Sequence, residues 1–126
     1  MLGRMITVVA VVCLLAVSVL AADQSHQSTL SPAKAEASRK YPQIVLYSVA
    51  WCSHCKETKE YFTRNNIPFT NRDVEVDQKA MEELTGKYNS NGVPVIVIGS
   101  GANEVVVKGF TPDLFQESLK KAQSRK

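Results

Sequence analysis

The chain has 126 residues and a formal net charge of +3, from 15 lysines and arginines against 12 aspartates and glutamates. This length argues for one folded domain, and so small and scattered a positive excess argues against a nucleic-acid-binding protein. Hydrophobic residues make up 44% of the chain, which contains three cysteines. A small secreted domain held by disulfides needs a larger, even set of cysteines, so this domain must be stabilised by its packed core.

An uncharged, mostly apolar run extends from Met5 to Ala22 and follows Arg4. A positive start, an apolar stretch and small residues near its end are typical of a secretory signal, with cleavage expected after Ala21. The length of this run is also close to the roughly 20 apolar residues needed to cross a bilayer. The alternative is therefore that residues 5–22 stay uncleaved and anchor the protein in the membrane. In both cases we expect an exported protein of the periplasm or cell envelope. Cys13 belongs to the segment that cleavage removes.

The remaining sequence divides into a tether and a folded domain. Residues 22–41 are rich in Ser, Gln, Ala and Lys, which is typical of a flexible linker, with a short helix predicted from Pro32 to Arg39. His26 in this stretch is expected to be a surface residue rather than a metal ligand. Residues 42–126 are expected to form the domain.

Within that domain, short apolar runs alternate with amphipathic segments, and the pattern predicts the order βαβαββα. Strands are expected at residues 43–48, 69–76, 94–98 and 104–108, with a helix over 51–65. Two further helices are expected, one capped by Asp77 and one with Thr111 as its N-cap. The buried positions expected on the last two helices are Met81, Leu84, Tyr88, Leu114, Phe115 and Leu119. Strands linked through helices are expected to pair in parallel, and the last two as a hairpin. The fold class is therefore α/β, with a four-stranded mixed sheet and helices on both faces.

Cys52-Ser53-His54-Cys55 stands where the first strand ends and the first helix begins. Zinc needs four ligands, and the mature chain offers only this segment and the remote His26. A static disulfide is also disfavoured, because closing so short a loop contributes little to stability. The motif therefore predicts a redox-active pair.

The three side chains of this motif receive different roles. Unpaired N–H groups and the helix dipole favour a thiolate on Cys52, which is therefore the expected nucleophile. Cys55, one turn further on, is the expected resolving thiol. A partly protonated His54 beside the pair stabilises the thiolate and is predicted to make the couple more oxidising.

Residues Gln43 to Ala122 resemble glutaredoxins and, more closely, the glutaredoxin-like thiol donors that reduce ribonucleotide reductase. The resemblance rests on Cys52 and Cys55 after a strand, Thr58-Lys59, Gly92-Val93-Pro94 and the run from Gly109 to Asp113. It implies a thioredoxin-like (glutaredoxin) three-layer fold and thiol–disulfide oxidoreductase activity. It also implies that Pro94 is cis and stands opposite the reactive cysteine.

A cis proline there leaves the backbone of Val93 free to pair with an extended substrate. The other expected substrate-binding residues are Trp51, Gly109, Phe110 and Thr111. Glutathione is a possible co-substrate, but Val49 and Gly92 stand where glutathione-using members usually carry a Lys or Arg and a Thr, which argues against glutathione specificity. We expect protein or small-molecule thiols and disulfides as substrates, a redox-recycling partner, a monomer, and no required cofactor or metal.

Two alternatives use the same sequence differently. The first is a carrier without turnover: two such chains share an iron–sulfur cluster, or one chain holds a copper ion through Cys52. The second is a pure binding module, which predicts that loss of both cysteines leaves function intact.

Overall fold

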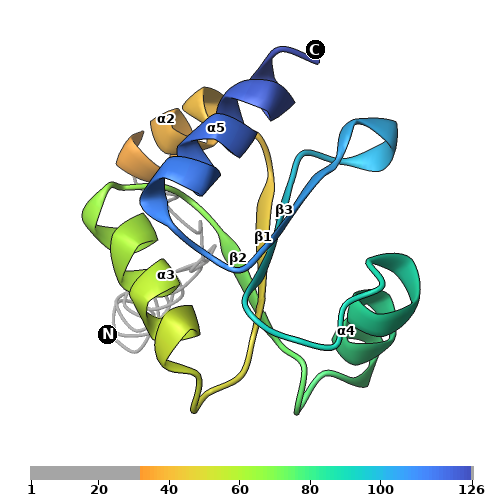
Figure 1. The fold of residues 1–126 in the computed structure, drawn as a ribbon. Helices are drawn as coiled ribbons and strands as arrows, with labels where there is room; N and C mark the ends of the chain where they lie inside the picture. Colours follow the sequence, from red (N-terminus) through yellow and green to blue (C-terminus); the bar gives the residue numbers. More distant parts are fainter. Residues whose placement is uncertain (1–31, 126) are drawn as a thin grey trace, which may run out of the picture.

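The computed structural model describes residues 32–125, so the expected signal, its cleavage after Ala21, Cys13 and His26 lie outside the described residues. Helices and strands alternate along this part of the chain as predicted (Figure 1). The elements are α2 (Pro32–Lys40), β1 (Ile44–Ser48), α3 (Ser53–Arg64), β2 (Thr70–Asp73), α4 (Gln78–Glu82), the π-helical turn η2 (Glu83–Lys87), β3 (Val95–Ile98), the 3-10 turn η3 (Gly101–Asn103), β4 (Val105–Lys108) and α5 (Pro112–Gln123).

The four strands form one mixed sheet in the order β2-β1-β3-β4. β1 is parallel to β2 and antiparallel to β3, and β3 and β4 form the predicted antiparallel hairpin. Helices cover both faces, with α3 and α5 on one side and α4 on the other (Figure 1). The α/β class, the mixed sheet and the βαβαββα order are confirmed.

One expectation about strand pairing is wrong, because β3 does not pair with β2 although a helix connects them. Ser48, at the end of β1, lies opposite Asp73, the last residue of β2, while the adjacent Tyr47 lies opposite Val95, the first residue of β3. The segment containing α4 and η2 therefore leaves the sheet and returns to it at the same end. As a result β3 runs in the direction opposite to β2, with β1 between them.

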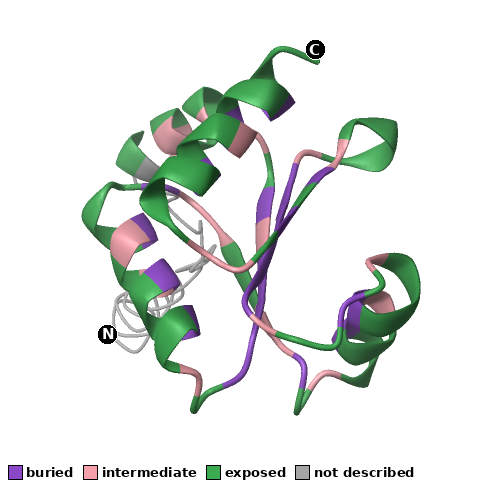
Figure 2. Ribbon diagram, viewed as in Figure 1, coloured by how far each residue is buried: buried purple, intermediate pink, exposed green. Residues whose placement is uncertain are grey.

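The central strands β1 and β3 are buried on both faces, as their mostly apolar sequences require. Alternate residues face opposite sides, so Ile44 and Leu46 pack under α3 and α5, whereas Tyr47 packs under α4. Phe62 and Phe115 are fully buried on the first side, with ring centroids 4.8 Å apart. Figure 2 shows the buried positions along the central strands and on the inner sides of the helices.

Met81 and Leu114 were expected in the core and are instead exposed, by 39% and 40%. Ala80 and Leu84, four residues apart, form the buried stripe of the α4–η2 segment, which turns Met81 outward. In α5 the buried positions are Phe115, Leu119 and Ala122, so Leu114 falls outside their stripe.

Polar side chains fix the ends of several elements. The predicted caps of α4 and α5 are confirmed, since Asp77 Oδ1 accepts from the Ala80 N–H and Thr111 Oγ1 accepts from the Leu114 N–H. α3 ends at Asn65 and Asn66 as predicted, with Asn66 in the left-handed conformation at φ 52°. β2 is shorter than predicted, because the Asp77 N–H donates to the Asp73 carbonyl and closes a turn.

Arg72 links β2 to α4 and η2 through two carboxylates. Its guanidinium donates to Asp77 Oδ2 at 2.8 and 3.0 Å and also pairs with Glu83, to which the Tyr47 hydroxyl donates at 2.7 Å. The Tyr47 hydrogen bond and the Arg72 charge lower the pKa of Glu83, although partial burial opposes them. This cluster holds the short helix against the sheet.

The helix predicted from Pro32 to Arg39 is confirmed and continues to Lys40. Ala33 and Ala37 of α2 line a groove together with Phe62, Ile67 and Phe69. Among the helices of residues 32–125, none combines the length and apolar character needed to cross a bilayer.

We predict that Phe62→Ala lowers the free energy of unfolding by about 3–5 kcal/mol, because it empties a fully buried site between α3, α5 and the sheet. Urea denaturation followed by circular dichroism measures this change. The control is Val106→Ala on the outer side of β4, where a half-exposed side chain is lost and the cost should stay below about 1 kcal/mol. Equal losses in the two variants would contradict the assigned core.

Candidate active site

Cys52 occupies the N-cap of α3, at the carboxyl end of β1. Its φ of −80° and ψ of 117° are extended, so the chain turns from strand to helix at this residue. Cys52 Sγ accepts a hydrogen bond from the Cys55 N–H at 3.1 Å. An N–H aimed at sulfur and the positive end of a twelve-residue helix both stabilise negative charge on that atom. The structure therefore places Cys52 Sγ at the positive end of α3, at the strand–helix junction that the sequence predicted.

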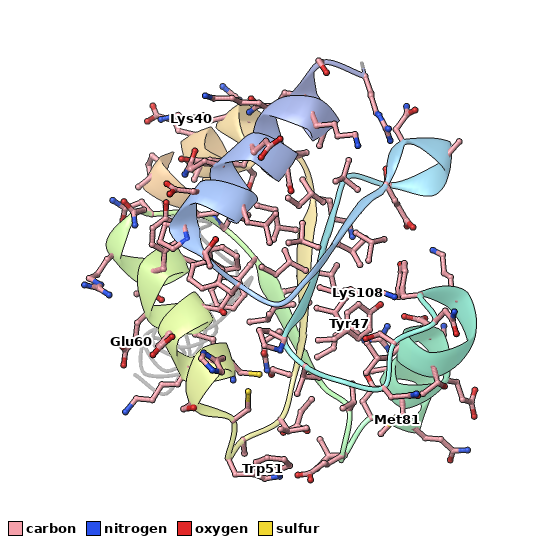
Figure 3. All side chains as sticks on the ribbon, in the orientation of Figure 1. Lys40, Tyr47, Trp51, Glu60, Met81 and Lys108 are labelled. Atoms are coloured by element: carbon pink, nitrogen blue, oxygen red, sulfur yellow. The ribbon has the colours of Figure 1, made fainter. Side chains whose placement is uncertain are left out.

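Cys55 lies in the first turn of α3 and is fully buried, whereas Cys52 is half-buried, and both are free thiols. Burial raises the pKa of Cys55 to about 11, and the hydrogen bond to Cys52 acts in the same direction. The two sulfurs thus differ in their access to solvent, and burial makes the Cys55 thiol harder to ionise than a free cysteine. Figure 3 shows two sulfur atoms, in yellow, close together at the start of α3, with Trp51 labelled nearby.

His54 faces solvent, with 73% of its side chain exposed. Its Nδ1 lies 3.4 Å from Glu57 Oε2, one helical turn further along α3. When the imidazole is protonated, the Glu57 carboxylate offsets part of its positive charge, so less of that charge acts on the cysteine pair. The effect of His54 on the redox couple therefore stays a prediction.

The next turn of the helix is fixed by a buried hydroxyl. Thr58 is fully buried, and its Oγ1 donates to the His54 carbonyl at 2.7 Å. This bond satisfies the hydroxyl inside the core and ties the backbone of the Cys52–Cys55 turn to the helix.

The loop before β3 and the residues after β4 meet near the cysteines. The Val93–Pro94 peptide bond is cis, as the resemblance implied. Val93 and Cys52 are half-buried against the same core cluster under α4. The Gly109 N–H donates to the Pro94 carbonyl at 2.9 Å, and Gly109 has a φ of 86°, which favours glycine.

Two more residues of the predicted substrate site, Phe110 and Thr111, make contacts within the protein. The Phe110 ring packs 5.3 Å from the Tyr61 ring on the α3 side of the sheet. The Thr111 hydroxyl accepts the capping hydrogen bond of α5. Of the six expected substrate-binding residues, the structure thus brings Val93, Pro94 and Gly109 together and leaves Trp51 exposed beside Cys52.

Sequence reasoning missed the partner of Trp51. The indole Nε1 donates to Glu75 Oε1 at 2.8 Å, across the gap between the β1–α3 and β2–α4 connections. Trp51 and Glu75 are 24 residues apart, and only the parallel pairing of β1 with β2 brings them to the same end of the sheet. The β2–α4 loop therefore belongs to the rim of the site.

Among residues 32–125, no group of three or more His, Cys, Asp or Glu side chains is arranged to hold a metal ion. The chemistry that the described groups support is that of two neighbouring thiols, one accessible and one buried.

Comparison with known proteins agrees with this geometry. Residues 44–101 match the glutaredoxin family. The N-acetyl-S-hydroxy-L-cysteine reductase of Bacillus subtilis is 41% identical over 58 residues, which are 46% of this chain and 62% of the reductase, so the match leaves more than a third of that protein uncovered. The glutaredoxin of Pseudomonas aeruginosa is 33% identical over 58 residues, 46% of this chain and 69% of that protein.

A solved structure also resembles the fold. The crystal structure of the thioredoxin-like protein BC3987 superposes with a TM-score of 0.54 at 31% identity, covering 61% of this chain and 100% of that one. The predicted thioredoxin-like fold is confirmed. The chain belongs to the glutaredoxin family of thiol–disulfide oxidoreductases.

Proposed function

We propose that this protein exchanges disulfides with protein or small-molecule thiols through Cys52 as nucleophile and Cys55 as resolving thiol. The observation that supports these roles is the hydrogen bond from the Cys55 N–H to Cys52 Sγ, the more accessible of the two sulfurs. The reaction needs two sulfurs and no resident cofactor or metal.

The exchange proceeds in two steps. The Cys52 thiolate attacks one sulfur of a substrate disulfide, so a mixed disulfide forms and the other substrate sulfur leaves as a thiolate that takes up a proton. Cys55 then loses its proton and attacks Cys52 Sγ, which releases the second substrate sulfur. The substrate has gained two electrons and two protons, and the protein holds a Cys52–Cys55 disulfide.

The raised pKa of Cys55 fits this order of events. A buried thiol that stays protonated does not compete with Cys52 for the incoming disulfide. It becomes the attacking group only after a mixed disulfide has formed on Cys52, one helical turn away. The short distance between the two sulfurs then raises the rate of attack, although the Cys55 thiol is a weak acid. Regeneration of the two thiols requires two electrons, from a protein partner with two thiols or from two molecules of glutathione, which are oxidised to a disulfide. If the cycle runs in the oxidising direction, a disulfide donor regenerates the Cys52–Cys55 disulfide instead.

We further propose that the protein works in the periplasm or cell envelope. The support is the uncharged sequence from Met5 to Ala22 after Arg4. Export without cleavage leaves the domain anchored by residues 5–22, and cleavage after Ala21 releases it.

The two cysteines are predicted to give opposite results on substitution. Cys55→Ser should accumulate a mixed disulfide with substrate, because nothing resolves it, whereas Cys52→Ser should form none and lose exchange activity by at least about 100-fold. Non-reducing gels and mass spectrometry after incubation with oxidised insulin measure the adduct. Trapping by Cys52→Ser instead would reverse the assigned roles.

The compartment is tested on the full chain expressed with its own N-terminus. We predict that cell fractionation finds the protein in the envelope. If the signal is cleaved, the mass of the released protein should correspond to a chain that begins at Ala22. A full-length protein confined to the cytoplasm would contradict export while leaving the redox assignment intact.

A further inference from the structure

Two large apolar side chains remain exposed at the end of the sheet that carries Cys52. Trp51 is 76% exposed and Val76 is 84% exposed, the highest values among the large hydrophobic side chains of residues 32–125. Trp51 precedes the reactive cysteine, and Val76 lies in the β2–α4 loop. The two connections project from the same end of the molecule (Figure 1).

The hydrogen bond between Trp51 and Glu75 joins these connections into one surface. With its N–H satisfied by the carboxylate at 2.8 Å, the indole presents its faces to solvent without an unpaired donor. Val76 follows Glu75 directly, so the apolar residue of the loop is adjacent in the chain to the residue that the indole contacts. We name Trp51, Glu75 and Val76 the rim surface.

The position of the rim surface limits what covers it. A molecule whose sulfur reaches Cys52 Sγ must pass beside Trp51, so the occupant is the chain that flanks the reacting disulfide. A small thiol compound extends too little to use Val76 as well, whereas a polypeptide has side chains on both sides of its cysteine.

Charge adds a second constraint on the occupant. Glu75 is an exposed carboxylate fixed at the edge of the apolar groups. Asp77 and Glu83, nearby in sequence, are both paired with Arg72, whereas the described contacts give Glu75 no basic side chain as partner. A lysine or arginine of the partner is the group that complements it.

We propose that the rim surface binds a substrate polypeptide that carries an apolar residue and a basic residue next to its disulfide cysteine. This inference rests on the proposed exchange through Cys52 and specifies its substrate class. Trp51 and Val76 contact the apolar side chain, and Glu75 both positions Trp51 and pairs with the basic side chain. The sulfur chemistry is the two-step exchange described above.

The test uses short peptides whose single cysteine is joined in a mixed disulfide to 2-nitro-5-thiobenzoate, which is coloured when released. The peptides are Leu-Cys-Lys, Ser-Cys-Lys and Leu-Cys-Glu, and the same disulfide of free cysteine serves as the small substrate. The fully reduced chain should react with Leu-Cys-Lys at least about fivefold faster than with either other peptide, as expected for one partly buried side chain or one exposed charge pair.

Variants assign each preference to a residue. Val76→Ser should abolish the Leu-over-Ser preference, and Glu75→Gln, which keeps an oxygen acceptor for the indole, should abolish only the Lys-over-Glu preference. The matched controls are Val106→Ser on β4 and Glu117→Gln on α5, both exposed positions outside the rim surface, which should keep both preferences. Circular dichroism verifies that every variant is folded.

The outcomes separate this inference from the proposed function. Equal rates for all three peptides, or loss of the preferences in Val106→Ser and Glu117→Gln as well, would overturn the rim surface as the binding site. If the reduced chain reacts with the free-cysteine disulfide no faster than an ordinary thiol does, the exchange function itself fails.

Discussion

The hydrogen bond from the Cys55 N–H to Cys52 Sγ is the interaction on which the proposed function depends. It exists because the chain changes from strand to helix at Cys52, so that an N–H without a helical acceptor points at the sulfur. The same turn places the second sulfur one helical turn away and inside the core. In the proposed exchange, the half-buried Cys52 at the helix start is the attacking thiol, and burial raises the pKa of Cys55.

The pairing of the strands brings segments that are distant in the sequence to this turn. The centre of the sheet is β1, whose end lies opposite the end of β2 and the beginning of β3. Consequently the loop with Glu75 and the loop with Pro94 both reach the level of Cys52. The Gly109–Pro94 hydrogen bond adds the segment after β4. Residues from four parts of the chain therefore meet at the end of the sheet that carries Cys52.

Patterns local in the sequence predicted much of this arrangement. Continuous apolar strands, the Asp77 and Thr111 caps, and two cysteines at a strand–helix junction each depend on neighbouring residues, and the structure confirms them. The cis form of Pro94 came from family resemblance, because local preference alone favours trans.

What the sequence did not reveal depends on distant contacts or on helix phase. Placement of β3 antiparallel to β1 follows from the return of the chain after η2, which no local pattern encodes. Met81 and Leu114 are as apolar as their buried neighbours, and only the phase set by Leu84 and Phe115 turns them outward. Likewise, nothing near Trp51 in the sequence indicates that Glu75 accepts its hydrogen bond.

The most direct measurement of the central claim is the alkylation rate of each cysteine by iodoacetamide from pH 5 to 9, assigned by peptide mass spectrometry. At pH 6 Cys52 should react at least about fivefold faster than free cysteine, because the Cys55 N–H and the start of α3 stabilise negative charge on its sulfur. Cys55, with its pKa raised to about 11, should stay unmodified throughout the range. Equal rates for Cys52 and free cysteine, or faster modification of Cys55, would contradict the account.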